Sequence, residues 1–100
     1  MLVKLCDKDV LPVGELKPFK IKEVEVMAIN IGNKVYCLDA RCSHAGAPLS
    51  EGTLEGTVLT CPWHYSQFDI NNGVVLSGPA GKPLKTYAVE ERQNVFFIDL

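Results

Sequence analysis

The chain lacks several features that would point to common classes of function. No run of apolar residues in this chain of 100 residues approaches the roughly 18 consecutive apolar residues of a membrane-spanning helix. No basic cluster accompanies the net charge of −2, which argues against a nucleic-acid partner. The N-terminus has no positively charged region followed by an apolar one, so we expect no export signal and a cytoplasmic location. These absences favour a small protein that does not cross a membrane and keeps its thiols reduced.

Histidine is also scarce, and each of the two histidines closely follows a cysteine. The two segments read Cys42-Ser43-His44 and, after sixteen intervening residues, Cys61-Pro62-Trp63-His64. Each segment offers one thiolate and one imidazole, which suits a [2Fe–2S] cluster whose cysteines bind one iron and whose histidines bind the other. The sequence therefore predicts a metal centre with the ligands Cys42, His44, Cys61 and His64.

Two other interpretations of the cysteines stay open at this point. A Cys2His2 set also forms tetrahedral zinc sites, and a zinc-stabilised interaction module without a redox role is therefore an alternative. Zinc fingers usually place both cysteines before both histidines, whereas the order here alternates. The other two cysteines, Cys6 and Cys37, lie in strand-like apolar segments, and we expect them to pack in the core.

The residues around the predicted ligands resemble the Rieske iron–sulfur family. The segment 45–52 after the first ligand pair is similar to that family's first cluster-binding loop, and 62–69 is similar to its second. The segment Ser77-Gly78-Pro79-Ala80 is similar to the proline-containing loop that covers the cluster from a third side. The resemblance is strong from about Asp39 to Pro83, and it implies one [2Fe–2S] cluster in the chain.

The resemblance implies a soluble one-electron carrier, a Rieske-type ferredoxin, and not an enzyme by itself. It suggests a flavoprotein reductase as electron donor and an oxygenase as acceptor. The small subunit of an assimilatory nitrite reductase is an alternative, because family members of that kind look similar. We find no separate catalytic constellation, so the chain is expected to act as a component of a multicomponent oxidoreductase system.

A further residue, Ser66, is expected to bind the cofactor through its hydroxyl. High-potential respiratory members of the family carry a serine and a tyrosine after the last ligand, where this chain has Ser66 and Phe68. Their disulfide between the two cluster loops would fall at Ala47 and Trp63, so it is absent here. Hydrogen bonds to cluster sulfurs raise the potential, and we therefore predict a low-to-middle potential. The alternative for Ser66 is a solvent-facing turn residue.

The sequence predicts an all-β protein. Short strands are predicted at Leu2–Cys6, 23–31, 34–38, 57–60, 67–70, 74–76, 84–89 and 95–100. A Gly32-Asn33 turn is expected between the second and third of these, a loop at 8–17, and a hairpin end at 90–94. The family resemblance implies an antiparallel β sandwich or barrel in a single domain, 1–100, with a cluster-binding subdomain inserted at about 40–78.

Overall fold

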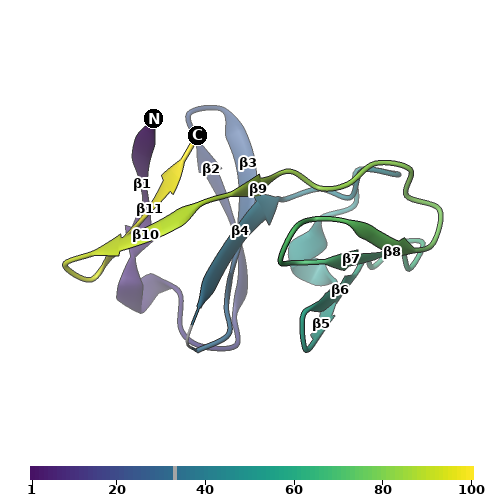
Figure 1. Cartoon of the computed structure of the whole chain (residues 1–100), viewed down its shortest axis with the longest axis horizontal. Helices are drawn as coiled ribbons and strands as arrows, with labels where there is room; N and C mark the ends of the chain where they lie inside the picture. The colour runs from purple at the N-terminus through teal and green to yellow at the C-terminus, as the bar shows by residue number, and fades with distance from the viewer. Residues whose placement is uncertain (33) are drawn as a thin grey trace.

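The computed structural model describes residues 1–32 and 34–100, so Asn33 of the predicted turn lies outside the described residues. The described residues form three antiparallel sheets, with the two chain ends side by side at one end of the molecule (Figure 1). The strands are β1 (Leu2–Asp7), β2 (Leu16–Ile21), β3 (Val24–Asn30), β4 (Val35–Asp39), β5 (Thr53–Glu55), β6 (Val58–Thr60), β7 (Gln67–Asp69), β8 (Val75–Ser77), β9 (Thr86–Tyr87), β10 (Val89–Arg92) and β11 (Val95–Asp99). Two 3₁₀ turns, η1 (Lys8–Val10) and η2 (Leu49–Glu51), accompany them. The predicted all-β antiparallel class is confirmed.

The sheet β2-β3-β4-β9 is the middle layer of the molecule. Strand β3 is buried at every position from Val26 to Asn30, which means that both of its faces are covered. Val26 and Ala28 pack in the apolar core shared with the sheet β1-β11-β10, whereas Met27 and Ile29 pack in the core shared with the sheet β5-β6-β7-β8. A strand covered on both faces needs a continuous apolar run, as the sequence of β3 provides.

The third sheet, β5-β6-β7-β8, lies at the end of the molecule away from the chain termini (Figure 1). It belongs to a segment, residues 40–78, that we call the distal lobe. This segment leaves the middle sheet after β4, and the chain returns to that sheet through β9. We take these bounds from the cluster-binding insertion predicted from the sequence. The assignment of the whole chain to a single domain stays a prediction, tested below by removing a ligand.

The structure corrects the prediction at the last hairpin. The strand Val89–Arg92 continues past Val89 through 90–92, where the hairpin end is predicted, and the turn is confined to Gln93 and Asn94. Both turn residues have positive φ angles, 50° and 65°, which suit the tight turn of a two-residue hairpin. Strand β10 lies at a sheet edge with its acidic side chains exposed. Because it has few apolar residues, the sequence shows no strand pattern there.

Two strands are absent from the prediction. Strand β2 runs through Pro18, is exposed at Pro18 and Lys20, and lies at the edge of the middle sheet. Proline is tolerated there because an edge strand has one side without a ladder partner. Strand β5 has only three residues, Thr53–Glu55, and carries no distinct apolar pattern.

The two cysteines expected in the core are buried there. Cys6 and Cys37 lie in the apolar core between the β1-β11-β10 sheet and the middle sheet, with exposed fractions of 7% and 2%. Burial raises the pKa of the Cys37 thiol to about 12, with Asp39 and Cys6 adding to the effect. Both thiols are free and pack as small apolar groups. Within the described part of the chain, no helix has the length and apolar character needed to cross a bilayer.

Candidate metal centre

The first cysteine–histidine segment forms a compact turn, Cys42–Ala47, that we call the first arm. The backbone N–H of Cys42 donates to the carbonyl of Ala47 at 2.9 Å, and the N–H of Gly46 donates to the carbonyl of Cys42 at 2.9 Å. Gly46 has φ +73°, a conformation that glycine adopts without steric cost. The turn therefore folds around the backbone of Cys42 and directs His44 outward, to an exposed position.

The second segment, Cys61–Ser66, repeats this geometry and is called the second arm. The N–H of Cys61 donates to the carbonyl of Ser66 at 2.8 Å, and the N–H of Tyr65 donates to the carbonyl of Cys61 at 3.2 Å. Here the residue with positive φ is Tyr65, at +61°, in the place that Gly46 has in the first arm. A non-glycine residue in this region carries a steric cost.

The arms bring the two cysteines together beneath the surface. Cys42 is 4% exposed and Cys61 is 1% exposed. Burial raises the pKa of the Cys42 thiol, the backbone N–H groups of His44 and Ala45 lower it, and the adjacent Cys61 thiol raises it further.

The arms bring the two histidines together at the surface. The rings of His44 and His64 have centroids 4.9 Å apart and meet edge to face, with an angle of 73° between their planes. Both residues are exposed. The four predicted ligands thus form an inner pair of sulfurs and an outer pair of imidazoles.

This paired arrangement fits a two-iron cluster better than a single metal ion. Over residues 1–32 and 34–100, no three His, Cys, Asp or Glu side chains gather as the ligand set of one metal ion. A mononuclear zinc site draws four ligands toward one point, whereas a mixed-ligand [2Fe–2S] cluster takes two protein ligands at each iron. The donors present, two soft sulfurs and two imidazoles, are those that such a cluster needs.

The residue Ser66 ends the second arm and is fully buried, which excludes the solvent-facing alternative. Its Oγ accepts a hydrogen bond from the backbone N–H of Ala80 at 3.0 Å. A hydroxyl that accepts one bond still has its own hydrogen to donate. Gly78 has no room for a side chain, because a Cβ there would lie 2.6 Å from the Cα of Ser66. The second arm and the segment after β8 are therefore in close contact.

Two side chains beside the predicted ligands were not identified from the sequence. Ser43 donates from Oγ to the carbonyl of Lys82 at 2.6 Å, which joins the first arm to the loop before β9. Arg41 contacts both Glu25 of β3 and the carbonyl of Gly46. Ser43 and Arg41 lie beside a predicted ligand, but their partners are distant in the sequence, so only the fold reveals these contacts.

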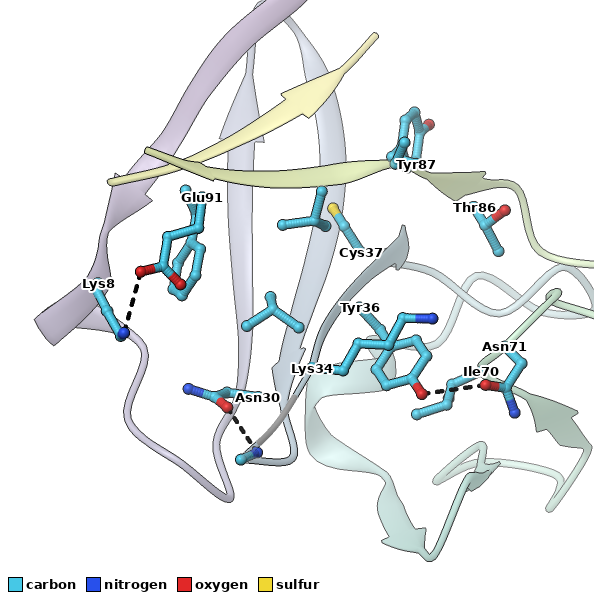
Figure 2. Close-up of a pocket in the computed structure, with 15 residues that line it drawn as sticks. Lys8, Asn30, Lys34, Tyr36, Cys37, Ile70, Asn71, Thr86, Tyr87 and Glu91 are labelled. Atoms are coloured by element: carbon cyan, nitrogen blue, oxygen red, sulfur yellow. Dashed lines mark hydrogen bonds and ion pairs between the residues drawn. The ribbon is translucent and has the colours of Figure 1, made fainter. Parts of the chain in front are cut away.

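A separate cavity of about 440 Å³ lies away from the arms, between β4, β10 and the turn at Asn71 (Figure 2). Figure 2 shows that polar side chains at its wall already bond to one another: Lys8 pairs with Glu91 at 3.1 Å, and the Tyr36 hydroxyl bonds Asn71 at 3.1 Å. None of the five predicted site residues lines this cavity. The cavity is therefore not part of the candidate metal centre.

Comparison with known proteins agrees with the fold. The family model of the Rieske [2Fe-2S] domain matches residues 1–88. The ferredoxin component of biphenyl 2,3-dioxygenase from Rhodococcus jostii is 32% identical over 99 residues, which cover 99% of this chain and 92% of that protein. The ferredoxin of carbazole 1,9a-dioxygenase from Nocardioides aromaticivorans superposes with a TM-score of 0.90 at 28% identity, over 98% of this chain and 96% of that one.

A further similar structure contains a partner. It is a complex of reduced oxygenase and oxidized ferredoxin in carbazole 1,9a-dioxygenase, and it matches with a TM-score of 0.86 at 28% identity over 97% of this chain and 91% of that chain. The chain studied here belongs to the Rieske [2Fe-2S] domain family. Within that family it is a ferredoxin-type electron carrier with a [2Fe–2S] cluster as cofactor, and it is not itself a catalyst.

Proposed function

We propose that one [2Fe–2S] cluster per chain is held between the two arms. In this proposal Cys42 and Cys61 bind the inner iron as thiolates, and His44 and His64 bind the outer iron as neutral imidazoles. The burial of the two cysteines and the surface pairing of the two histidines support this assignment. The cluster supplies one-electron redox chemistry, and the mixed ligands give it a higher potential than an all-cysteine cluster.

The exposed histidine pair is the proposed point of electron exchange. An imidazole that binds metal through one ring nitrogen presents the other to its surroundings, and His44 and His64 both lie at the surface. Trp63 and Tyr65 flank His64 in the second arm and are 53% and 72% exposed. Exposed aromatic side chains are typical of protein–protein contact sites. A partner that docks there would lie against the imidazoles.

The proposed acceptor is an oxygenase, and the proposed donor is a flavoprotein reductase in the cytosol. The oxygenase is supported by the similar ferredoxin that forms a complex with its oxygenase. The reductase is inferred from the family resemblance. The zinc module and the nitrite reductase subunit receive no support, because the matching family is a [2Fe–2S] domain and the relatives above are dioxygenase ferredoxins.

The single observation that carries the ligand assignment is the pairing of the four side chains, sulfurs inside and imidazoles outside. Its test is substitution of each cysteine in turn. We expect Cys42→Ser and Cys61→Ser to abolish the electron paramagnetic resonance (EPR) signal of the reduced protein and its bound iron. Cys6→Ser and Cys37→Ser are the matched controls, since both cysteines are buried in the other core. Loss of the cluster in either control would overturn the assignment.

A further inference from the structure

The two arms have the same internal geometry but different support. The second arm connects β6 to β7, which pair with each other at Thr60 and Gln67 immediately outside the arm. The antiparallel pairing of β6 with β7 therefore fixes both ends of the second arm. The first arm follows β4, which ends at Asp39, and among the described residues its base is closed by an isolated bridge between Arg41 and Pro48 in place of a strand ladder. The first arm thus has less backbone support at its base.

The side chain of Arg41 supplies a further attachment for the first arm, in addition to the bond from Ser43 to the carbonyl of Lys82. Its Nε donates to Oε2 of Glu25 at 2.6 Å, and its Nη1 donates to the carbonyl of Gly46 at 3.0 Å. Glu25 lies in β3 of the middle sheet, whose backbone also accepts a hydrogen bond from Ala40. The N–H of Gly46 already bonds Cys42 within the arm. The guanidinium therefore links the turn that carries the predicted ligands to the middle sheet.

We propose that Arg41 is a positioning residue for the cluster, which fixes the first arm, and with it Cys42 and His44, relative to the second. The proposal rests on the ligand assignment above. Arginine suits this role because its planar guanidinium can donate to two acceptors in fixed directions, whereas a lysine ammonium acts as a point charge. Groups that orient metal ligands contribute strongly to how tightly a metal is held. A fixed arm also limits ligand movement when the electron arrives or leaves.

The alternative is that Arg41 and Glu25 form an ordinary surface ion pair with little effect. The chain offers a matched pair for comparison. Arg92 forms an ion pair with Glu90, with Nε 2.7 Å from Oε2, and the exposures of these side chains, 62% and 47%, resemble those of Arg41 and Glu25, 56% and 46%. The Arg92 pair lies in strand β10, far from the arms (Figure 1). The Arg92 pair lies within one strand, whereas Arg41 bonds both Glu25 of β3 and the carbonyl of Gly46.

The test compares Arg41→Met and Arg41→Lys with Arg92→Met in the cluster-loaded protein. The first readout is the rate at which a ferrous chelator removes iron, and the second is the line width of the EPR signal of the reduced protein. We expect Arg41→Met to release iron about tenfold faster than the parent and to broaden the signal, as when a group that orients a ligand is removed. Arg41→Lys, which keeps the charge, should give an intermediate rate, and Arg92→Met should match the parent.

Equal rates and equal line widths for Arg41→Met and Arg92→Met would overturn the proposal. A parent-like Arg41→Lys beside a fast Arg41→Met would also overturn it, because charge alone would then explain the effect. If Arg41→Met fails to fold, Arg41→Lys and Glu25→Gln provide the same readouts, and parent-like behaviour of both would count against the role. Failure of the ligand assignment is distinguishable, because the cluster would then be lost in Cys6→Ser or Cys37→Ser, or retained in Cys42→Ser, whatever the behaviour of the Arg41 variants.

Discussion

At the scale of single residues, the second arm ends in a buried hydroxyl that we propose donates to the cluster. Ser66 is fully buried, and its Oγ accepts from Ala80, which orients the hydroxyl and leaves its hydrogen to donate. A donor aimed at a cluster sulfur stabilises the more negative, reduced state. Phe68, two residues later, is buried but has no hydroxyl to add a second donor. This combination underlies the predicted low-to-middle potential.

We therefore expect Ser66→Ala to lower the reduction potential while the cluster stays bound. Loss of a hydrogen bond that favours the reduced state by about 1.4 kcal/mol corresponds to about 60 mV for one electron. Ser77→Ala is the control, because that hydroxyl is exposed and bonds Gln67 at 3.0 Å. Redox titration followed by circular dichroism measures both variants. An unchanged potential in Ser66→Ala would remove the proposed role of the hydroxyl.

A second residue-scale prediction concerns alkaline pH. Burial, and then the hydrogen bond to Asp39, raises the pKa of Tyr87 from 10.0 to about 12. Since the pKa in the folded chain lies above that of the unfolded chain, the stabilisation is complete below pH 10 and is lost as the pH rises toward 12. The buried Cys37 acts in the same direction, starting near pH 9.

Urea unfolding between pH 8 and pH 11.5 tests this expectation on the parent and on Tyr87→Phe. The parent should lose stability across the upper part of the range, and Tyr87→Phe should lose less. Absorbance titration should show one tyrosine that ionises late and is missing from the variant. Identical pH profiles of the two proteins would contradict the assigned environment of Tyr87.

The sequence predicts the residues of the site well where their partners are close in the chain. Each predicted ligand pair spans three or four residues, so the pairing of sulfur with imidazole is visible without a structure. The partners of Arg41 and Ser43 are not, because Glu25 lies 16 residues before Arg41 and Lys82 lies 39 residues after Ser43. Such contacts depend on how the middle sheet and the arms meet, which local sequence does not specify.

At the scale of elements, the two arms are the same turn built from different residues. The fifth position has positive φ in both, and it is Gly46 in the first arm but Tyr65 in the second. The second arm thus carries backbone strain at an exposed residue beside His64. Strain of this kind persists where the surroundings enforce the conformation, and it is frequent at functional sites.

Replacement of Tyr65 by glycine should relieve this strain. We expect Tyr65→Gly to stabilise the cluster-loaded protein by about 1 kcal/mol, because glycine adopts the left-handed region freely. Tyr65→Ala is the control, since it removes the ring and keeps the backbone cost. Thermal unfolding followed by circular dichroism measures both. A lower midpoint for Tyr65→Gly than for Tyr65→Ala would contradict the account of the second arm.

The elements that the sequence does not predict share a physical cause. Strand β2 contains Pro18, β5 has three residues, and β10 is acidic at its exposed positions. All three lie at sheet edges, where one side of the strand needs no partner and the apolar pattern is weak. Strands inside a sheet, such as β3 and β11, carry apolar residues, and these residues make the strands predictable from the sequence.

At the scale of the whole molecule, the middle sheet separates two cores. One core lies between it and the β1-β11-β10 sheet, and the other lies between it and the distal lobe, with Leu49, Leu59 and Phe68 among the buried residues of the lobe. The lobe is built from short strands and long connections, so bound metal should contribute much of its order. The first core contains none of the predicted ligands.

Loss of the cluster should therefore reduce the order of the distal lobe more than that of the β1-β11-β10 sheet. In His64→Ala we expect fast amide hydrogen exchange in β5 to β8 and in both arms, with slow exchange retained in β1, β10 and β11. Hydrogen exchange followed by NMR or mass spectrometry gives the pattern. Equal protection of the lobe in His64→Ala and in the parent would show that the lobe is ordered without its metal. Complete loss of protection everywhere would show that the chain behaves as one unit.

The most direct test of the account is the EPR spectrum of the purified, dithionite-reduced protein, with iron, sulfide and zinc measured on the same sample. The account predicts a rhombic signal of a mixed-ligand [2Fe–2S] cluster, with two irons and two sulfides in each chain. A silent spectrum from a sample that contains stoichiometric zinc and no iron would contradict it, and would leave a structural zinc module in place of an electron carrier.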